Sequence, residues 1–519
     1  MSQIDFNGAK AIITSAGTWV NRHQNVRQRF DRLCDIWNTP HFTSNRLADL
    51  QNTIGLIQRL LSDAAASGGE LRAFGGGWSL STAAATGGAM VNTKPMNWYF
   101  PLGPASYHTD YRGDRATAVY LQCGMSVGEV NRYLGEMGLA LKTSGASDGQ
   151  TIVGAISTGT HGSRFGFGAM QDYVIGIHLI VSPTRTVWLE RGSYPVVNAD
   201  FAARFKAELI RDDELFNAAL VGFGSFGVIH GVMIEAEKLY VLDATRVQMP
   251  LTPGLERAMA TLDFSQADLP RPGTPPFDQE PLHFQVVYNP HDRSGHPYVT
   301  VMYQRPYPAN YQSPPPYAGG LGPGDDLLNV IGTLTEMLPD VILPGVIGGI
   351  MSVLVGQIFG SLANRIATPG DTFSPTNELG KGMSTEIGVP LEYVLRARDI
   401  LLAAHPEVDN YAGFIAFRYV KGSKALLAFT RYPMSCAIEL PAAYSPLTMA
   451  YYERIWSDFE RAGIPYTLHW GQMNNFTPSV VRRMYGDDVD RWIDARTRLL
   501  DPAMRKVFSN DFMRTCGLG

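Results

Sequence analysis

The sequence predicts an α+β fold, and three observations along the 519-residue chain support that prediction. Up to about residue 237, segments with the apolar spacing of helices alternate with short runs typical of strands. From about 238 to 455 strand-like runs dominate, and their β-branched content favours a mostly antiparallel sheet. From about 456 to 519 the pattern is helical again. We therefore expect three stretches, 1–237, 238–455 and 456–519, within the size of two or three domains.

The first stretch contains helices and short strands in alternation. Residues 47–66 carry leucine and isoleucine at helical spacing, which predicts an amphipathic helix. A second helix is predicted over 126–138, because Ser126 and Glu129 have the spacing of a capping box. The strands expected here are 71–74, 118–123, 174–181, 187–190 and 228–234. The third and fourth of these flank a short segment with a proline, which predicts a hairpin.

The second stretch is expected to be a sheet interrupted by loops. Two proline-rich segments, 269–276 and 307–323, are predicted to be long surface loops. The strands expected around them are 283–288, 298–303, 413–420 and 425–430. In the last stretch, 488–500 is predicted to be an amphipathic helix that ends at Asp501-Pro502.

Composition and charge argue against several kinds of function. The chain has 43 Lys and Arg against 48 Asp and Glu, a formal net charge of −5, so a chain-wide electrostatic grip on nucleic acid is not expected. The four cysteines are far apart, so neither a metal site nor a disulfide framework is predicted. The N-terminus lacks the pattern of a secretory signal, and we expect a cytoplasmic protein. No signal points to a particular oligomeric state.

One uncharged segment, 341–363, is long enough to span a bilayer on length alone. Its five glycines and Pro344 argue against a transmembrane helix, so no stable membrane span is predicted. We interpret the segment as a buried or cap helix. The alternative is a hydrophobic insertion that lines a substrate entrance.

A first candidate ligand site is the glycine cluster Arg72-Ala-Phe-Gly-Gly-Gly-Trp-Ser79, which follows a predicted strand. Glycines have no Cβ, so backbone N–H groups can converge on an anion there, and Ser79 can add a hydroxyl donor. The pattern fits a phosphate cradle, with a flexible turn as the alternative.

A second cluster, 150–163, is rich in glycines and hydroxyl groups and carries no formal charge. A flat cofactor could pack against such a surface and still find hydrogen bonds. The alternative is a core segment in which glycines allow close packing. A third segment, 222–227, spells GxGxxG, but the helix-like 213–220 precedes it and a predicted strand follows. This order is the reverse of a dinucleotide-binding Rossmann unit, so no Rossmann site is predicted.

These segments together resemble the FAD-binding segments of the vanillyl-alcohol-oxidase superfamily. The similar segments are 72–79, 150–163 and 216–229. His469-Trp-Gly-Gln472 and Asn510-Asp-Phe512 are similar to the aldonolactone/alditol oxidase branch. The resemblance extends over roughly 45–235 and 464–515. It is thin in between, where it rests on 385–390 and Arg418.

The resemblance implies an FAD-binding domain built from 1–237 and 456–519, with an antiparallel-sheet substrate (cap) domain, 238–455, between them. It also implies that the pyrophosphate lies on the amides of Gly75 to Ser79 and the isoalloxazine near Thr151 to Gly162. FAD is therefore the expected cofactor. The residues implied to bind it are Phe74, Gly75, Gly76, Gly77, Trp78, Ser79, Ser144, Thr151, Ile152, Gly154, Ala155, Ser157, Thr158, Gly159, Thr160, His161, Gly162, Gly227 and Ile229.

The activity that the resemblance implies is oxidation of an alcohol carbon by hydride transfer to the flavin, with O2 as the acceptor and H2O2 as product. The expected partners are thus a small-molecule alcohol and O2. Two alternatives stay open. The protein is a dehydrogenase that uses another electron acceptor, or an FAD-binding scaffold diverted to a non-oxidase biosynthetic role.

Three positions depart from the family pattern. Many members have a flavin-linked histidine where this chain has Trp78, so non-covalent FAD is expected. The sugar-oxidising branch has Glu-x-Arg where this chain has Ala416-Phe-Arg418, and a lysine where it has Gln472. A simple polyol is therefore less expected as substrate, and a bulky apolar alcohol more so.

Five residues are candidates for the chemistry: Arg418, His469, Gln472, Glu386 and Glu439. Arg418 is the preferred one, because a fixed cation can stabilise the negative charge of a reduced flavin. The alternative for Arg418 is an ion pair within the cap sheet. His469 has the chemistry of a base near neutral pH, with a structural histidine as the alternative. Glu386 and Glu439 are the other candidate bases.

Overall fold

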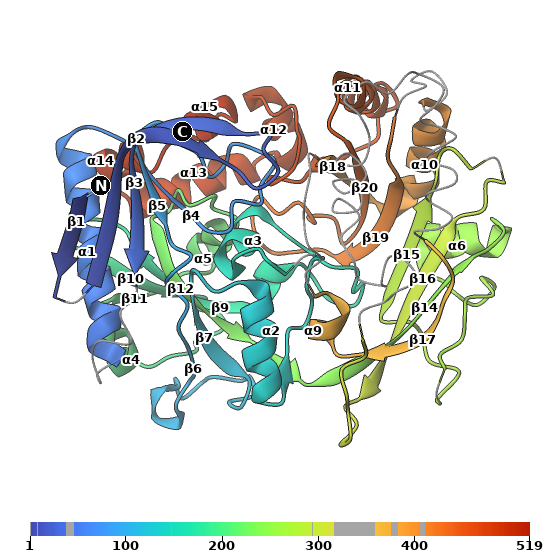
Figure 1. Cartoon of the computed structure of the whole chain (residues 1–519), viewed down its shortest axis with the longest axis horizontal. Helices are drawn as coiled ribbons and strands as arrows, with labels where there is room; N and C mark the ends of the chain where they lie inside the picture. The colour runs from blue at the N-terminus through green and yellow to red at the C-terminus, as the bar shows by residue number, and fades with distance from the viewer. Residues whose placement is uncertain are drawn as a thin grey trace.

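The computed structural model describes the chain except residues 1, 8, 38–45, 147, 274, 293, 316–358, 375–381 and 405–410. Figure 1 shows a part with N-terminal strands, in blue, beside C-terminal helices, in red. A second part, in yellow and orange, is dominated by one large sheet. The predicted α+β class with an antiparallel cap sheet is confirmed.

A five-stranded sheet forms the N-terminal edge of the molecule, with β1 (Ser2–Phe6), β2 (Ala9–Val20), β3 (Arg27–Trp37), β5 (Ala89–Asn92) and β4 (Leu71–Phe74) in this order. The first three strands pair antiparallel, whereas β5 pairs parallel with both β3 and β4. Helix α1 (Arg46–Ala66) contacts this sheet and buries its apolar side. The helix predicted at 47–66 and the strand at 71–74 are confirmed, whereas β1 to β3 were not predicted.

A six-stranded sheet lies beside it, in the order β11 (Glu208–Arg211), β10 (Thr186–Glu190), β9 (Val174–Ile180), β12 (Val228–Glu235), β7 (Ala118–Gln122) and β6 (Tyr99–Pro101). Strands β9 and β10 form the predicted hairpin. Helix α2 (Val127–Glu136) begins with the predicted capping box. The Ser126 hydroxyl accepts from the Glu129 N–H at 3.1 Å, and the Glu129 carboxylate accepts from the Ser126 N–H at 2.8 Å.

The cap is an eight-stranded antiparallel sheet. Its order is β17 (Leu362–Ala367), β14 (Tyr240–Gln248), β16 (Tyr298–Pro306), β15 (His283–Tyr288), β19 (Ile415–Lys421), β20 (Met434–Ala443), β18 (Gly382–Pro390) and β21 (Thr467–Leu468). The helices α6 (Pro253–Thr261), α10 (Val394–Ala404) and α11 (Pro446–Arg461) contact one another or the sheet. Strand β20 pairs with β18 on one side and with β19 on the other, so 382–390 lies beside 434–443 although the two are far apart in the sequence.

The strand predicted at 425–430 is wrong. These residues form turns, although all six side chains are buried. Side chains of the C-terminal stretch hold their backbone, since Trp470 donates to the Leu427 carbonyl at 2.8 Å and Thr467 to the Phe429 carbonyl at 2.7 Å. The apolar run that suggested a strand therefore reflects burial of a loop.

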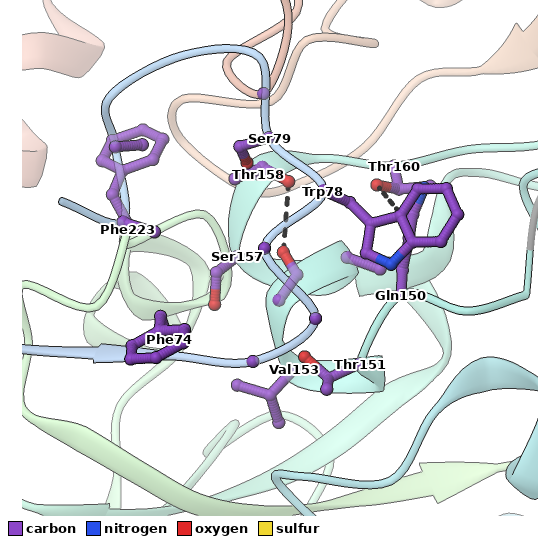
Figure 2. A pocket seen from close by; sticks show the side chains of 18 of the residues that line it. Phe74, Trp78, Ser79, Gln150, Thr151, Val153, Ser157, Thr158, Thr160 and Phe223 are labelled. Atoms are coloured by element: carbon purple, nitrogen blue, oxygen red, sulfur yellow. Dashed lines mark hydrogen bonds between the residues drawn. The ribbon is translucent and has the colours of Figure 1, made fainter. Parts of the chain in front are cut away.

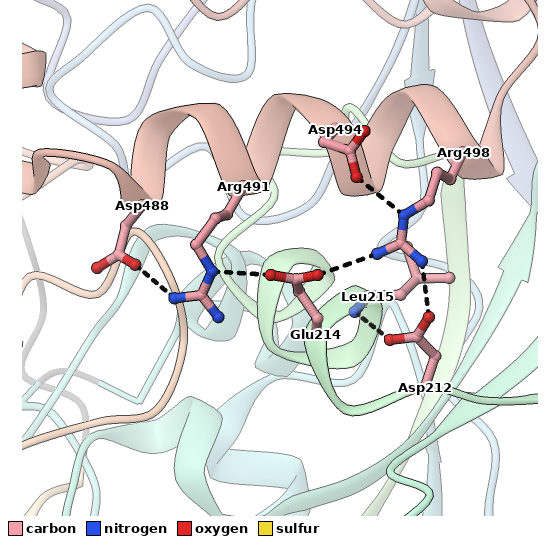
Figure 3. A network of polar contacts seen from close by, with 7 residues as sticks. All are labelled: Asp212, Glu214, Leu215, Asp488, Arg491, Asp494 and Arg498. Atoms are coloured by element: carbon pink, nitrogen blue, oxygen red, sulfur yellow. Dashed lines mark hydrogen bonds and ion pairs between the residues drawn. The ribbon is translucent and has the colours of Figure 1, made fainter.

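The C-terminal segment returns to the N-terminal part through α12 (Pro478–Tyr485), α13 (Asp488–Leu499), α14 (Pro502–Val507) and α15 (Asp511–Thr515). Helix α13 packs on α5 (Asp213–Leu220), and Figure 3 shows the polar network that joins them. The Nε of Arg491 lies 2.7 Å from Glu214 Oε1, and Nη1 of Arg498 lies 2.8 Å from Asp212 Oδ2. The predicted C-terminal helix is confirmed by α13, which ends just before Asp501-Pro502.

The remaining described elements are short: α3 (Ile152–Thr158), α4 (Ala199–Arg204), α9 (Pro369–Thr372), β8 (Leu139–Ala140), β13 (Glu237–Lys238) and the 3-10 turns Pro104–Ser106, Met170–Tyr173 and Leu391–Tyr393. The uncharged segment 341–363 lies outside the described residues up to 358, and its end enters β17. The predicted loop 307–323 also lies partly outside them. Within the part of the chain that the structure describes, no helix could cross a membrane, and no cluster of side chains could hold a metal ion.

Candidate active site

One pocket extends from the glycine loop 75–77 to the cap sheet. Figure 2 shows the part of it that the glycine loop and helix α3 line. It brings together segments that are far apart in the sequence: the loop after β4, helix α3, the loop before β12 and three cap strands. All five candidate catalytic residues line it. The predicted cofactor residues that line it are Phe74, Gly75, Gly76, Gly77, Trp78, Ser79, Thr151, Gly154, Ala155, Ser157, Thr158, Thr160, His161, Gly227 and Ile229.

The glycine loop lies directly on the start of α3. A Cβ at Gly75 would stand 2.0 Å from Thr151 Oγ1, and one at Gly76 would stand 2.6 Å from the Trp78 ring. Gly77 has a φ of +71°, which favours glycine. The three glycines are therefore required by close packing and by backbone conformation, and their backbone forms the pocket wall.

Helix α3 contributes small and hydroxyl-bearing residues to the pocket. Figure 2 shows Ser157 and Thr158, which line the pocket together with Ser79, and the Thr158 hydroxyl donates to the Gly154 carbonyl at 3.1 Å. The helix ends at Gly159, whose φ of +84° is the left-handed conformation typical of a helix C-terminus.

Four residues that the resemblance assigned to FAD do not line the pocket: Ser144, Ile152, Gly159 and Gly162. The side chain of Ile152 is fully buried in the hydrophobic core. Gly162 packs against the chain at Ser144, because its Cβ would stand 2.5 Å from the Ser144 carbonyl. Gly159 serves as the end of α3. These residues support the pocket from behind.

The loop Gly222–Gly227 forms a further wall, although α5 precedes it and β12 follows, as expected for a segment that is not a Rossmann motif. Its carbonyls are held from outside the pocket. Arg72 donates to the Phe223 carbonyl at 2.5 Å, and Arg496 donates to the Ser225 carbonyl at 2.9 Å. Phe223 lines the pocket together with Phe74. It belongs to the FAD-like segment 216–229 but was not among the residues expected to bind the cofactor.

At the cap end, Arg418 bridges two carboxylates from neighbouring strands. Its Nη1 lies 3.5 Å from Glu386 Oε1 on β18, and its Nη2 contacts Glu439 Oε2 on β20. Glu439 is paired across the sheet with both Glu386 and Ala416. A carboxylate therefore stands beside Arg418 despite the alanine at 416. The inference that the site loses this carboxylate is corrected, because the neighbouring strand supplies it.

His161 is paired with Glu386. Its Nε2 lies 3.1 Å from Glu386 Oε1, and its Nδ1 lies 2.9 Å from the Gly162 carbonyl. Both ring nitrogens thus lie near acceptor oxygens, an arrangement that favours the doubly protonated, cationic ring. Burial alone lowers the pKa of His161, but Glu386 and the Gly162 carbonyl outweigh it, so the pKa is raised. Burial alone would raise the pKa of Glu386, but the nearby His161 and Arg418 outweigh burial, so the pKa is lowered overall.

The two carboxylates differ in proton affinity. Burial raises the pKa of Glu439, the charge of Glu386 raises it further, and Arg418 opposes both, with a net rise. Glu386 is held charged, and the Gln472 amide also donates to its Oε2 at 3.3 Å. Gln472, which stands where the related enzymes have a lysine, thus forms a hydrogen bond to Glu386.

His469 is fixed by the backbone. Its Nδ1 accepts from the Gly471 N–H at 3.1 Å, and the Gly159 carbonyl is its other backbone partner. Burial lowers the pKa of His469 to about 4. The ring is therefore neutral near pH 7 with both nitrogens engaged, which favours the structural interpretation of this histidine.

Comparison with known proteins adds the cofactor. Residues 52–189 match the family described as FAD binding domain, and this segment contains the glycine loop and α3. Residues 52–189 of this chain thus form an FAD-binding domain. The resemblance inferred from the glycine clusters is thereby confirmed, and FAD is the cofactor of the pocket.

The relatives are sugar-lactone oxidases by name. D-arabinono-1,4-lactone oxidase of Debaryomyces hansenii is 25% identical over 209 residues, 40% of this chain and 34% of that protein. L-gulonolactone oxidase 3 of Arabidopsis thaliana is 33% identical over 124 residues, 24% of this chain and 19% of that protein. The match thus spans about a third or less of these relatives. L-gulonolactone oxidase of Mus musculus is 21% identical over 487 residues, 91% of this chain and 97% of that protein.

Solved structures support the fold over the whole chain. Cholesterol oxidase from B. sterolicum has a TM-score of 0.67 at 13% identity and covers 98% of this chain and 97% of its own. A solvent-stable cholesterol oxidase has a TM-score of 0.65 at 14% identity and covers 98% of both chains. This protein therefore has a cholesterol oxidase-like fold, in which an antiparallel sheet cap accompanies the FAD-binding domain.

The residues present fit FAD. The loop 75–77 presents backbone without side chains, as a diphosphate requires. The carboxylates among the lining residues, Glu386 and Glu439, both stand at the cap end beside cations. No carboxylate among the lining residues therefore lies at the glycine-loop end, where it would repel a diphosphate. FAD bound with its diphosphate there would extend towards Arg418.

Several lining residues escaped sequence reasoning, above all Trp19 and His23 from the N-terminal hairpin. No local pattern marks them, because they reach the pocket through pairing of distant strands. Cys123 also lines the pocket from the end of β7. Burial raises the pKa of its thiol to about 12, so it stays protonated and unreactive at neutral pH.

We expect FAD to dissociate when the protein is denatured. Trp78 cannot form the link that histidine forms in related enzymes, and Cys123 is held as a thiol. The measurement is flavin fluorescence of acid-precipitated protein on a denaturing gel. A fluorescent protein band would contradict the prediction. If that fluorescent band then disappeared in His23→Ala, the covalent bond to the flavin would be assigned to His23, which contacts Trp78 in the pocket.

Proposed function

We propose that the protein is an FAD-dependent oxidase that oxidises an alcohol carbon of a small molecule, with O2 as acceptor and H2O2 as product. The observation that carries this proposal is the single pocket that joins the FAD-binding loop to Arg418, Glu386 and Glu439. The names of the relatives, all oxidases, support it.

The charged side chains at the cap end have different roles. FAD, when bound, supplies the hydride acceptor and returns electrons to O2. Arg418 provides a fixed positive charge where negative charge develops during oxidation. Glu439 is the better proton acceptor for the substrate hydroxyl, because its pKa is raised while that of Glu386 is lowered. Glu386 and His161 remain an ion pair that fixes Arg418 from the other side.

This assignment predicts a pH shift in Glu386→Gln. Activity needs ionised Glu439, so it rises with pH as that carboxyl loses its proton. The Glu386 charge raises the pKa of Glu439 more than His161 lowers it, so removing Glu386 lowers that pKa. The acid limb of the pH–rate profile should therefore move to lower pH.

The measurement is substrate oxidation in single-turnover experiments across pH. Glu439→Gln is the matched control, since it should lose most of the activity together with this limb. A limb that stays in place in Glu386→Gln, or moves to higher pH, would assign the proton to another group.

The substrate class is open to a direct test. An apolar alcohol was expected because a carboxylate was missing at 416, because Gln472 stands in place of a lysine, and because of the uncharged segment 341–363. Glu439 now stands beside Arg418, while that segment lies outside the described residues up to 358. The panel therefore pairs polyols and sugar lactones with sterols and aromatic alcohols.

Purified holoprotein is mixed with each compound without air, and loss of flavin colour identifies substrates. Admission of air should restore the colour and release H2O2. Bleaching that only an artificial electron acceptor reverses would instead support the dehydrogenase. Absence of bleaching with every CH–OH compound would favour the diverted scaffold.

A further inference from the structure

The turn between β2 and β3 binds three carbonyl groups of 77–80, the end of the glycine loop and the residues that follow it. The Arg22 N–H donates to the Gly77 carbonyl at 2.8 Å. The side-chain amide of Asn21 donates to the Ser79 carbonyl at 2.9 Å, and that of Asn25 donates to the Leu80 carbonyl at 2.8 Å. These contacts bridge more than fifty residues of sequence.

The turn is itself rigid. Asn21 uses its Oδ1 to accept from the Val26 N–H at 2.9 Å, and its Nδ2 also donates to Asn25 Oδ1 at 2.6 Å. Asn21 is only 3% exposed, so water does not replace these bonds. Asn21 therefore donates to the Ser79 carbonyl and to Asn25, whereas Asn25 donates to the Leu80 carbonyl and to Met473 Sδ at 3.7 Å.

Holding these carbonyls has a consequence for the amides. In a trans peptide the C=O of one residue and the N–H of the next point in opposite directions. With the Gly77 carbonyl held on the hairpin, the Trp78 N–H points to the other side. The peptide between Ser79 and Leu80 is held at both of its polar groups. Asn21 donates to the Ser79 carbonyl, and the Leu80 N–H donates to the Gly471 carbonyl at 2.7 Å.

The same turn also flanks the Trp78 side chain. The Arg22 guanidinium lies 5.0 Å from the centre of the Trp78 ring, and the His23 ring lies 5.8 Å away at 76°. His23 and Trp78 both line the pocket. The hairpin thus contacts both the backbone of 77–80 and the side chain of Trp78.

We propose that Asn21 and Asn25 are positioning residues for the diphosphate of FAD, so that the N-terminal hairpin is a working part of the cofactor site. The hairpin lies outside the segment that matches the FAD-binding family, residues 52–189. The proposal rests on FAD binding and not on the alcohol chemistry of the proposed function.

The experiment compares FAD with riboflavin, which has the same ring system but no diphosphate. Full-length protein is stripped of flavin and titrated with each ligand by fluorescence. In Asn21→Ala and Asn25→Ala, the Kd for FAD should rise by about tenfold, the loss of one or two hydrogen bonds. The Kd for riboflavin should change by less than about twofold, because the ring end of the pocket is untouched.

Gln28→Ala is the matched control, since it removes a side-chain amide from the same hairpin that donates to the neighbouring Arg29 carbonyl at 2.8 Å. Asn25→Asp keeps the shape but loses the donor, so it should behave like Asn25→Ala. Equal losses for FAD and riboflavin would show general damage to the fold and overturn the proposal, as would an unchanged Kd for FAD. Because no substrate is present, failure of alcohol oxidation leaves this result unaffected.

Discussion

Replacing Arg418 by alanine is expected to slow substrate oxidation by about 10²-fold or more, the effect of losing one fixed group that stabilises developing charge. Arg418 is the cation that lies between Glu386 and Glu439 in the pocket. Without it, two buried carboxylates face each other across β18 and β20, and negative charge is repelled where it must develop. The measurement is the rate of flavin bleaching on rapid anaerobic mixing with substrate.

Loss of Arg418 also threatens the fold, because an unpaired buried charge is costly. The double variant Arg418→Ala with Glu439→Gln removes one charge of each sign, so it should recover much of the thermal stability but not the rate. Arg418→Lys should remain slow, because one ammonium cannot reproduce the two-pronged guanidinium contact. Unchanged bleaching in a stable Arg418→Ala protein would make Arg418 a structural ion-pair residue.

The sequence predicted those features that depend on residues close together in the chain. The capping box at Ser126, the hairpin of β9 and β10, and the glycine loop follow from local spacing, and the structure confirms these elements. The glycine loop was recognisable because three glycines in succession serve few purposes other than close approach of the backbone.

What escaped prediction depends on strand register between distant segments. Glu439 compensates for Ala416 because β19 and β20 pair them directly, and no spacing in the sequence reveals that register. The turn at Asn21 reaches the glycine loop through strands whose alternation was not recognised. The segment 425–430 shows the opposite error, since its apolar residues are buried in a loop held by Trp470.

Gly75→Ala should weaken FAD binding, because the added methyl group has no room beside Thr151. The new Cβ would stand 2.0 Å from Thr151 Oγ1, 2.6 Å from Thr151 Cγ2 and 2.8 Å from Thr151 Cβ. Rotating the threonine leaves the last of these contacts, so the loop or α3 must move. Overpacking of this kind typically costs about 1–3 kcal/mol, which corresponds to an increase of about 5- to 150-fold in Kd.

The cause is steric, because the φ of Gly75 is not in the left-handed region and alanine can adopt its backbone conformation. Thr151→Gly removes all three offending atoms, and glycine is tolerated where a helix begins. The double variant should therefore bind FAD more tightly than Gly75→Ala alone, a coupling that separates this contact from general damage. Gly87→Ala is the control, since its Cβ would meet only the Gln28 amide at 3.9 Å. Binding as tight as in the unmodified protein would show that the loop adapts without cost, and a double variant without recovery would place the strain elsewhere.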